Sequence, residues 1–347
     1  MTSRELVYKT LEFKNYDDRA PRDLWSLPYA RFYDGENFER ISRKYDWDIA
    51  APETVYLEKS KVTRGDSVEI GEYVDEWGCV FTNIKRGIIG EVKTPLVAAE
   101  DEEWEDISRI VIPEHMLSFD IEQINKACAA SDKFLMNGYK PRPFERLQFI
   151  RGTENLYVDL MLQPNGFIDF LDKMHDFHCR LITKWAETDI DAIRFMDDWG
   201  SQRSLLINPA LWRDLFKPMY RDFINIAHSH GKKIFMHSDG YILDILPDLI
   251  ELGLDAVNSQ IFCMGTDKLA PFKGQITFWG EMDRQHILPH GTKEDVEHAV
   301  EQVYNALWDN GGCIAQCEYG DCKAENVEAV YDTWDRLTKR SGEGCGV

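Results

Sequence analysis

The chain has 347 residues, of which 44% are hydrophobic and 29% charged, with 23 glycines and 13 prolines. This composition is that of a folded globular protein and excludes a fibrous or intrinsically disordered chain. The net charge of −21 disfavours nucleic acid and anionic lipid surfaces as partners, because both carry the same sign of charge.

The N-terminal residues Met1 to Lys9 are polar, and no stretch approaches the roughly 18 apolar residues that cross a membrane. The eight cysteines show no framework spacing, so we expect reduced thiols that either pack as apolar residues or bind a metal. The sequence therefore predicts a cytoplasmic protein.

The first half of the chain lacks a regular pattern. Lys61 to Glu91 alternate strand-like residues with glycine-containing breakers, which we interpret as a β-rich insertion, approximately residues 61–95, near a barrel mouth. No repeat, low-complexity tract or Pro- or Ser-rich linker marks a boundary, so we expect one domain over residues 1–347.

From about residue 164 onward, short apolar runs alternate with stretches of helical periodicity, which is typical of βα units. The spacing predicts helices around Leu211–Ile226, followed by Gly231, and after an N-cap at Thr292 with Asp295 three residues on. The predicted strands are Asp191–Met196, Lys233–His237, Asp255–Asn258, Gln275–Gly280 and Cys313–Cys317. Five strands in one half indicate a barrel or a large open sheet.

Each of these strands ends in side chains of the type that bind ligands, where a parallel barrel carries its chemistry. The five ends begin at Asp197, His237, Asn258, Glu281 and Cys317. Every member has a structural alternative: Asp197 or Asp198 as a cap, Asp283 paired with Arg284, and Cys317 as a small core residue.

His237, Asp239 and Cys317 form the sharpest subset. Residues i and i+2 at a strand end lie on the same side of the pleat, and a third ligand from a later strand completes a site. Imidazole, carboxylate and thiolate all bind zinc, and three protein ligands with an open position are typical of a catalytic centre. The pattern therefore predicts zinc at these three residues.

Several common motifs are absent from the sequence. Without Gly-x-Gly-x-x-Gly or Gly-x4-Gly-Lys-Ser/Thr, a bound dinucleotide or nucleoside triphosphate is not expected. Without Gly-x-Ser-x-Gly, a serine hydrolase of the usual α/β type is not expected either.

The run KKIFMHSDG at Lys232–Gly240, followed by LPDLIELG at Leu246–Gly253, resembles the uroporphyrinogen decarboxylase superfamily. DEWGC, GIIG, RGTENL and DDWGSQ, which begin at residues 75, 87, 151 and 197, are similar to that superfamily in the same order. The resemblance covers roughly residues 8–340 and implies a single (β/α)8 TIM barrel.

Within the superfamily, the residues resemble the zinc-dependent methyltransferases that use corrinoid proteins. The Arg-Gln-Ala-Gly-Arg stretch of the decarboxylases is missing; the corresponding region, Asp17–Trp25, reads DDRAPRDLW. The methyltransferases carry His-x-Cys and a distant Cys as zinc ligands, whereas this chain has His237-x-Asp239 and Cys317. A carboxylate donates less electron density than a thiolate, which favours activation of a leaving group.

The resemblance therefore implies a methyltransferase that demethylates a small compound, for example a methoxylated aromatic, and passes the methyl to Co(I) of a corrinoid protein. The chain has no Asp-x-His-x-x-Gly corrinoid signature, so the corrinoid is expected on a separate partner docking at residues 61–91 and the loop after Cys317. Glu281 or Glu318 is expected to donate a proton. The expected substrate contacts are Asp197, Asp198, Trp199, Gln202, Gln260, Trp279 and Tyr319.

Three alternatives stay open at this point. One is the reverse half-reaction, methyl transfer from the corrinoid to a thiol. Another is a metal-free decarboxylase or lyase that uses Asp197, Asp198 and His237. The third is a non-catalytic binding barrel.

Overall fold

The computed structural model describes residues 1–16, 18–280 and 282–339. Its strands are β1 (Arg22–Ser26), β2 (Ile49–Ala50), β3 (Gly71–Val74), β4 (Val80–Asn83), β5 (Glu91–Val92), β6 (Phe134–Leu135), β7 (Ala192–Met196), β8 (Lys233–Ser238), β9 (Ala256–Ser259), β10 (Thr277–Trp279) and β11 (Cys313–Tyr319). The five strands predicted from the second half correspond to β7 through β11 and are confirmed.

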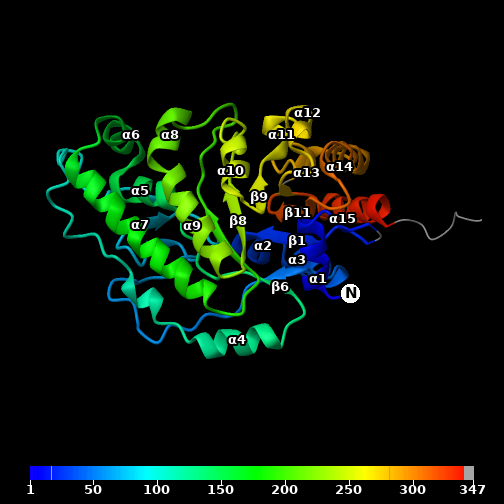
Figure 1. The fold of residues 1–347 in the computed structure, drawn as a ribbon, viewed down its shortest axis with the longest axis horizontal. Helices are drawn as coiled ribbons and strands as arrows, with labels where there is room; N and C mark the ends of the chain where they lie inside the picture. The colour runs from blue at the N-terminus through cyan, green and yellow to red at the C-terminus, as the bar shows by residue number, and fades with distance from the viewer. Residues whose placement is uncertain (17, 281, 340–347) are drawn as a thin grey trace, which may run out of the picture.

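The helices lie between and outside these strands (Figure 1). They are α1 (Ser3–Leu11), α2 (Pro28–Tyr33), α3 (Gly35–Lys44), α4 (Ile121–Ala129), α5 (Pro143–Arg151), α6 (Thr153–Leu162), α7 (Asn165–Ala186), α8 (Pro209–Leu215), α9 (Lys217–Ser229), α10 (Leu246–Leu252), α11 (Ile261–Met264), α12 (Thr266–Leu269), α13 (Ile287–His290), α14 (Lys293–Leu307) and α15 (Ala324–Thr338), with 3-10 turns η1 (Glu114–Leu117) and η2 (Ala270–Phe272). In the described part of the chain, no helix is both long and apolar enough to cross a bilayer.

Of the two helices predicted from the sequence, one is observed as expected and the other is divided. The capping box of Thr292 and Asp295 begins α14 as expected, and the helix ends at Leu307. The stretch predicted as one helix around Leu211–Ile226 is instead two, α8 and α9. Pro218 lies in the first turn of α9, where a proline is tolerated because that position donates no helical hydrogen bond.

The central sheet is parallel and follows the order β1-β11-β10-β9-β8-β7, curled into a half-barrel. A separate parallel pair, β2 and β6, lies between the two edge strands of this sheet, β7 and β1, and contacts both. On one side Met136 bridges to Ala192 beside β7, and on the other the backbone N–H of Asp48 donates to the carbonyl of Arg22 on β1. The expected TIM barrel is thus observed as an α/β fold with a curled parallel sheet, and full closure is not shown.

The pleat of the strands separates two apolar clusters. Alternate residues such as Phe235, Trp279 and Ile314 form an inner cluster, which Val7 and Leu11 of α1 join from one end. The intervening residues face the helices and belong to the larger outer cluster. Polar side chains on the sheet's inner face therefore lie beyond a layer of apolar ones.

The expected β-rich insertion is present as a three-stranded antiparallel sheet, β3-β4-β5. The peptide N–H of Tyr29 in α2 donates to the carbonyl of Gly87 in the loop between β4 and β5. This hydrogen bond joins the insertion to the segment that follows β1.

Candidate functional site

The loops after β7 and β8 are held together by their backbones. The N–H groups of Asp197 and Gly200 donate to the carbonyls of His237 and Asp239, at 2.9 and 3.1 Å. The contact requires glycine, because a Cβ at Gly240 (φ +76°) would lie 2.1 Å from the carbonyl oxygen of Gly200. This close approach brings the polar residues at the two strand ends together.

Asp198, His237 and Asp239 converge at this point, each offering a ligand atom within 4.8 Å of the others. Nε2 of His237 lies 3.5 Å from Oδ1 of Asp198 and 3.7 Å from Oδ1 of Asp239. Oδ1 of Asp198 also accepts the backbone N–H of Asp239 at 3.0 Å, which fixes the carboxylate beside the loop. The donors are one imidazole nitrogen and two carboxylates.

The orientation of His237 is determined by Asn258 on β9. The amide group of Asn258 donates to the carbonyl of Trp279 and to Oε1 of Gln316, so its Oδ1 is left as an acceptor. Oδ1 lies 2.5 Å from Nδ1 of His237. Nδ1 therefore donates to Asn258, and Nε2 is directed at the two carboxylates.

The two carboxylate oxygens of Asp239 have different surroundings. Oδ2 accepts a hydrogen bond from Arg284, which also binds Glu318. Oδ1 is buried and has no hydrogen-bond partner, although it lies on the side of His237. A buried carboxylate oxygen without a donor is costly, which suits a position that a cation occupies.

Two cavities open beside this group and share Leu27, Arg284 and Glu318 in their linings. The inner one, of about 450 Å³, is bounded by His237, Trp25, Met196 and two cations, Lys140 and Arg194. The outer one, of about 520 Å³, is bounded by Asp239, Tyr29, Lys85 and Gly320. Adjacent cavities with three shared lining residues thus extend from the insertion to His237.

Cys317 is not brought into this group, and its prediction as the third ligand needs correction. Its Sγ lies 3.3 Å from the hydroxyl of Tyr331 on α15, on the outer side of β11. The neighbouring Glu318 has the opposite orientation and lines the cavities. Because successive side chains of a strand point to opposite faces, only one of the two can reach the interior. Asp198, predicted as a substrate contact, occupies the place expected of Cys317.

Three of the expected substrate contacts are structural in this arrangement. The carboxylate of Asp197 accepts hydrogen bonds from the backbone N–H groups of Phe144 and Glu145 and from the hydroxyl of Tyr220. Trp199 is buried against aromatic neighbours, and its indole N–H donates to the same Tyr220 hydroxyl. Tyr319 is buried and donates to Asp34. None of the three lines the two cavities.

The other predicted residues differ in their positions. Gln202 and Gln260 line a third cavity of about 220 Å³, which also contacts Arg284. Trp279 lies beneath the site, where its indole N–H donates to Asp23. Glu281 lies outside the described residues, so its expected role in proton donation has no structural counterpart here.

Sequence reasoning missed four side chains at the site: Trp25, Lys140, Arg194 and Arg284. The ring of Trp25 lies beside that of His237, with centroids 5.0 Å apart and the planes tilted by 49°. Only Trp25 and Arg194 belong to strands, and Arg194 lies within β7 and not at its end. The search for polar residues at the ends of the five predicted strands could therefore not identify them, since β1 was not among those strands.

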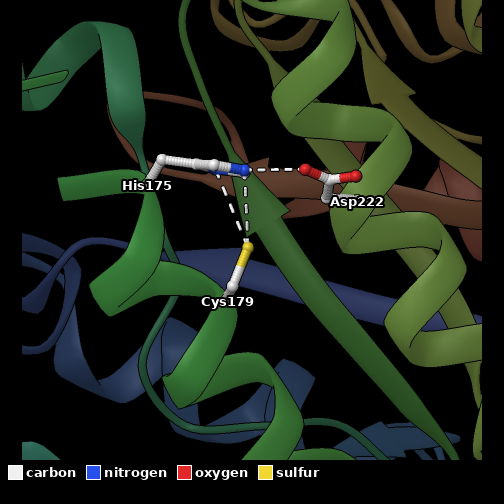
Figure 2. A group of neighbouring side chains, drawn as sticks. All are labelled: His175, Cys179 and Asp222. Atoms are coloured by element: carbon white, nitrogen blue, oxygen red, sulfur yellow. Dashed lines mark hydrogen bonds and ion pairs between the residues drawn. The ribbon is translucent and has the colours of Figure 1, made fainter. Parts of the chain in front are cut away.

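A second group of potential ligands lies on the outer helices, away from the entrance. Figure 2 shows His175 and Cys179 of α7 facing Asp222 of α9. Nε2 of His175 is 2.8 Å from Oδ2 of Asp222 and 3.6 Å from Sγ of Cys179. In a catalytic triad the acid and the nucleophile contact opposite ring nitrogens, whereas here Sγ also lies 3.8 Å from Nδ1 and approaches neither nitrogen alone. Burial, with Asp222 and Asp176 nearby, raises the pKa of Cys179 to about 12, so the thiol stays protonated.

Among the solved structures to which this chain is similar, one supports the fold. A structure described as a methyltransferase from Methanosarcina mazei has a TM-score of 0.64 at 13% identity, covering 97% of this chain and 99% of that one. A 3-keto-D-glucoside 4-epimerase from E. coli has a TM-score of 0.39 at 15% identity, covering 64% of this chain and 86% of its own. No curated protein matches the sequence.

The family model for uroporphyrinogen decarboxylase (URO-D) matches residues 87–337, which is more than half of the chain. This range includes the loops with Asp198, His237 and Asp239 as well as Lys140, Arg194 and Arg284. The chain therefore belongs to the uroporphyrinogen decarboxylase family.

Proposed function

We propose that the chain is a zinc-dependent methyltransferase that demethylates a small methylated compound and passes the methyl to Co(I) of a separate corrinoid protein. The observation that carries the proposal is the convergence of Nε2 of His237 with the carboxylates of Asp198 and Asp239 beside a cavity. The methyltransferase from Methanosarcina mazei shares the fold. A methyltransferase type is therefore compatible with this framework.

The residues present fit a zinc ion. One imidazole and two carboxylates are ordinary zinc ligands, and a three-residue set leaves a position for a substrate atom. The partnerless buried Oδ1 of Asp239 and the hydrogen bond that orients His237 both suit a cation between them. Bound zinc would supply Lewis acidity to the heteroatom that carries the methyl group.

The side chains of the cavity supply the remaining steps. When the bond between the methyl carbon and the heteroatom breaks, its electron pair stays on the heteroatom, which then needs a proton. We assign this proton to Glu318, which lines both cavities. Arg284 binds Glu318 and Asp239 together and would hold the acid beside the metal ligands. Trp25 lies against one side of the His237 ring and would contact the body of the substrate.

The partner would approach over the outer cavity. The rim there carries Tyr29 of α2 and Lys85 and Ile88 of the insertion. Transfer requires the acceptor atom within roughly 3 to 3.5 Å of the methyl carbon, so a corrinoid must enter this opening. The same site would serve the reverse reaction, from a methylated corrinoid to a thiol.

A metal-free decarboxylase or lyase is the second candidate. The observation that favours it is the hydrogen bond from Arg284 to Asp239, which already balances one carboxylate without a metal. In that case His237 and Asp198 would act on protons and would not bind zinc.

Zinc content separates the two candidates. The purified protein should contain one equivalent, measured by elemental analysis, and His237→Ala and Asp198→Ala should lose it. Cys317→Ser and Cys179→Ser are matched controls that should retain it. Loss of zinc in Cys317→Ser would support the ligand set expected from the sequence, with Cys317 as a ligand. An unsubstituted protein that binds no added zinc would favour the lyase.

Activity is then tested with a reduced corrinoid protein and a panel of methoxylated aromatics, thioethers and methylamines, observing the visible spectrum of the cobalt. Demethylation should appear as conversion of Co(I) to its methylated form. A zinc-loaded protein that converts no member of the panel, but methylates a thiol from a methylated corrinoid, would support the reverse direction.

A further inference from the structure

The inner cavity contains two basic side chains whose charges are poorly balanced. Lys140 follows β6, and Arg194 lies in the middle of β7 with its side chain on the inner face. Both line the cavity that His237 bounds. Among the described residues, neither makes an ion pair, and Nε of Arg194 is buried without a hydrogen-bond partner.

Asp23, the acid whose charge acts on both Lys140 and Arg194, is already engaged. Its Oδ2 accepts the indole N–H groups of Trp25 and Trp279, at 2.8 and 3.0 Å. The guanidinium of Arg194 lies 5.7 Å from the ring of Trp25 and 5.8 Å from that of Trp279, so the aromatic rings, and no carboxylate, contact it. Asp23 alone therefore opposes the charges of these two cations, because Glu318 in the same cavity is paired with Arg284.

The surroundings lower the pKa of both Lys140 and Arg194. Burial, together with the positive charges of Arg194 and Arg142, lowers the pKa of Lys140 to about 7. Burial also lowers the pKa of Arg194 to about 10, against a smaller opposing effect of Asp23. Cations held in this way are unfavourable unless an anion binds between them.

We infer that Lys140 and Arg194 form an anion subsite, and that the methylated substrate carries a carboxylate or a similar oxyanion at the end opposite its methyl group. This inference rests on the proposed function for the role of the methyl group. The anion occupies the inner end of the cavity, and the body of the molecule lies against Trp25 toward His237. A cationic methylamine is disfavoured by the same two residues.

Lys140 and Arg194 do not form a sequence motif that would predict an anion site. Arg194 lies within β7 between the hydrophobic residues Ile193 and Phe195, and Lys140 lies in the connection after β6. Their shared role appears only when β6 and β7 are neighbours, which the bridge from Met136 to Ala192 ensures.

The test is a binding measurement that needs neither corrinoid nor turnover. Calorimetry compares 4-methoxybenzoate with its neutral isostere 4-methoxybenzamide, and 3-(methylthio)propionate with its amide, on zinc-depleted protein. Each carboxylate should bind the parent at least about tenfold more tightly than its amide, as expected for charge-assisted hydrogen bonds. Zinc depletion ensures that the preference does not come from a carboxylate bound to the metal.

The variants assign the preference to the two residues. Lys140→Met and Arg194→Met should each reduce the ratio of affinities severalfold, and Lys140→Arg should retain it, which a merely structural role would not predict. Lys232→Met, a change of the same kind outside the cavity, should leave the ratio unchanged.

Equal binding of acid and amide, no saturable binding of either acid, or a ratio that persists in both Met variants would overturn the inference. The proposed function has a separate failure, which is the absence of zinc. An anion preference in a protein that binds no zinc would keep the subsite and reject the methyltransferase.

Discussion

Nδ1 of His237 lies 2.5 Å from Oδ1 of Asn258, a hydrogen bond between neighbouring strands that directs Nε2 toward Asp198 and Asp239. A histidine that binds a metal commonly has such a partner, which fixes the ring and its protonated nitrogen. We therefore expect Asn258→Ala to weaken zinc binding by roughly 10- to 100-fold, measured by competition with a chromophoric chelator.

The neighbouring Ser259 offers a matched control for this variant. Its hydroxyl is buried without a hydrogen-bond partner, so Ser259→Ala removes no interaction with the site. Its zinc affinity should equal that of the parent. If Asn258→Ala also binds zinc as tightly as the parent, His237 does not depend on this hydrogen bond.

The contact between Gly200 and Gly240 leads to a second prediction. In Gly240→Ala the new methyl group would meet the Gly200 carbonyl and the backbone would be strained at its positive φ, so the two loops must separate. We expect a loss of more than about 1 kcal/mol in the free energy of unfolding, together with weaker zinc binding. Urea denaturation and the chelator assay measure the two effects.

Gly231→Ala separates backbone strain from the contact. Gly231 also has a positive φ of +70°, but a Cβ there meets no atom within 4 Å. This variant should be destabilised by strain alone and should retain its zinc affinity. Equal zinc affinities in the two variants would show that the loops tolerate separation.

The pKa of Lys140 predicts how stability varies with pH. In the folded chain, burial and the nearby Arg194 and Arg142 lower this pKa from 10.5 to about 7, and Asp23 opposes the shift. Between these values the unfolded chain binds the proton and the folded chain does not, so the contribution of Lys140 to the free energy of unfolding rises with pH.

Lys140→Met removes this titration and should be more stable than the parent near pH 7 in the absence of added carboxylates. The difference should shrink toward pH 10, by at most about 1.4 kcal/mol per pH unit. Denaturation curves at several pH values measure it, with Lys232→Met as a control whose difference from the parent stays constant. A pH-independent difference for Lys140→Met would mean that the pKa of Lys140 is the same in the folded and the unfolded chain.

The extent to which the site was predictable follows from strand geometry. The strands β7 through β11 were predicted because each has a run of apolar residues, whereas β2 and β6 have two residues each and leave no pattern. At β11 the sequence predicted both Cys317 and Glu318 at the site, although adjacent strand residues face opposite sides. The choice between them depends on the register of β11 against β1, where Glu318 pairs with Trp25, and a single sequence does not reveal that register.

The rim of the outer cavity supports a last prediction, about the partner. Lys85 lies 4.2 Å from the ring centroid of Tyr29, and Arg86 lies 3.8 Å from that of Phe32, so the insertion and α2 present cations stacked on aromatic rings. Ile84 and Ile89 beside them are 85% and 58% exposed. Aromatic rings, arginine and exposed apolar side chains are typical of protein interfaces.

We expect Lys85→Glu and Arg86→Glu to lower the rate of methyl transfer to the corrinoid protein by about tenfold at low salt, because reversed charges slow association. Transfer to free cobalamin and zinc content should stay close to those of the parent, and Lys232→Glu, just before β8 and away from the entrance, should change neither rate. Stopped-flow measurements at two ionic strengths distinguish association from chemistry, since the loss should diminish as salt screens the charges. An equal loss with free cobalamin would instead show that these residues shape the substrate cavity, to which Lys85 also contributes.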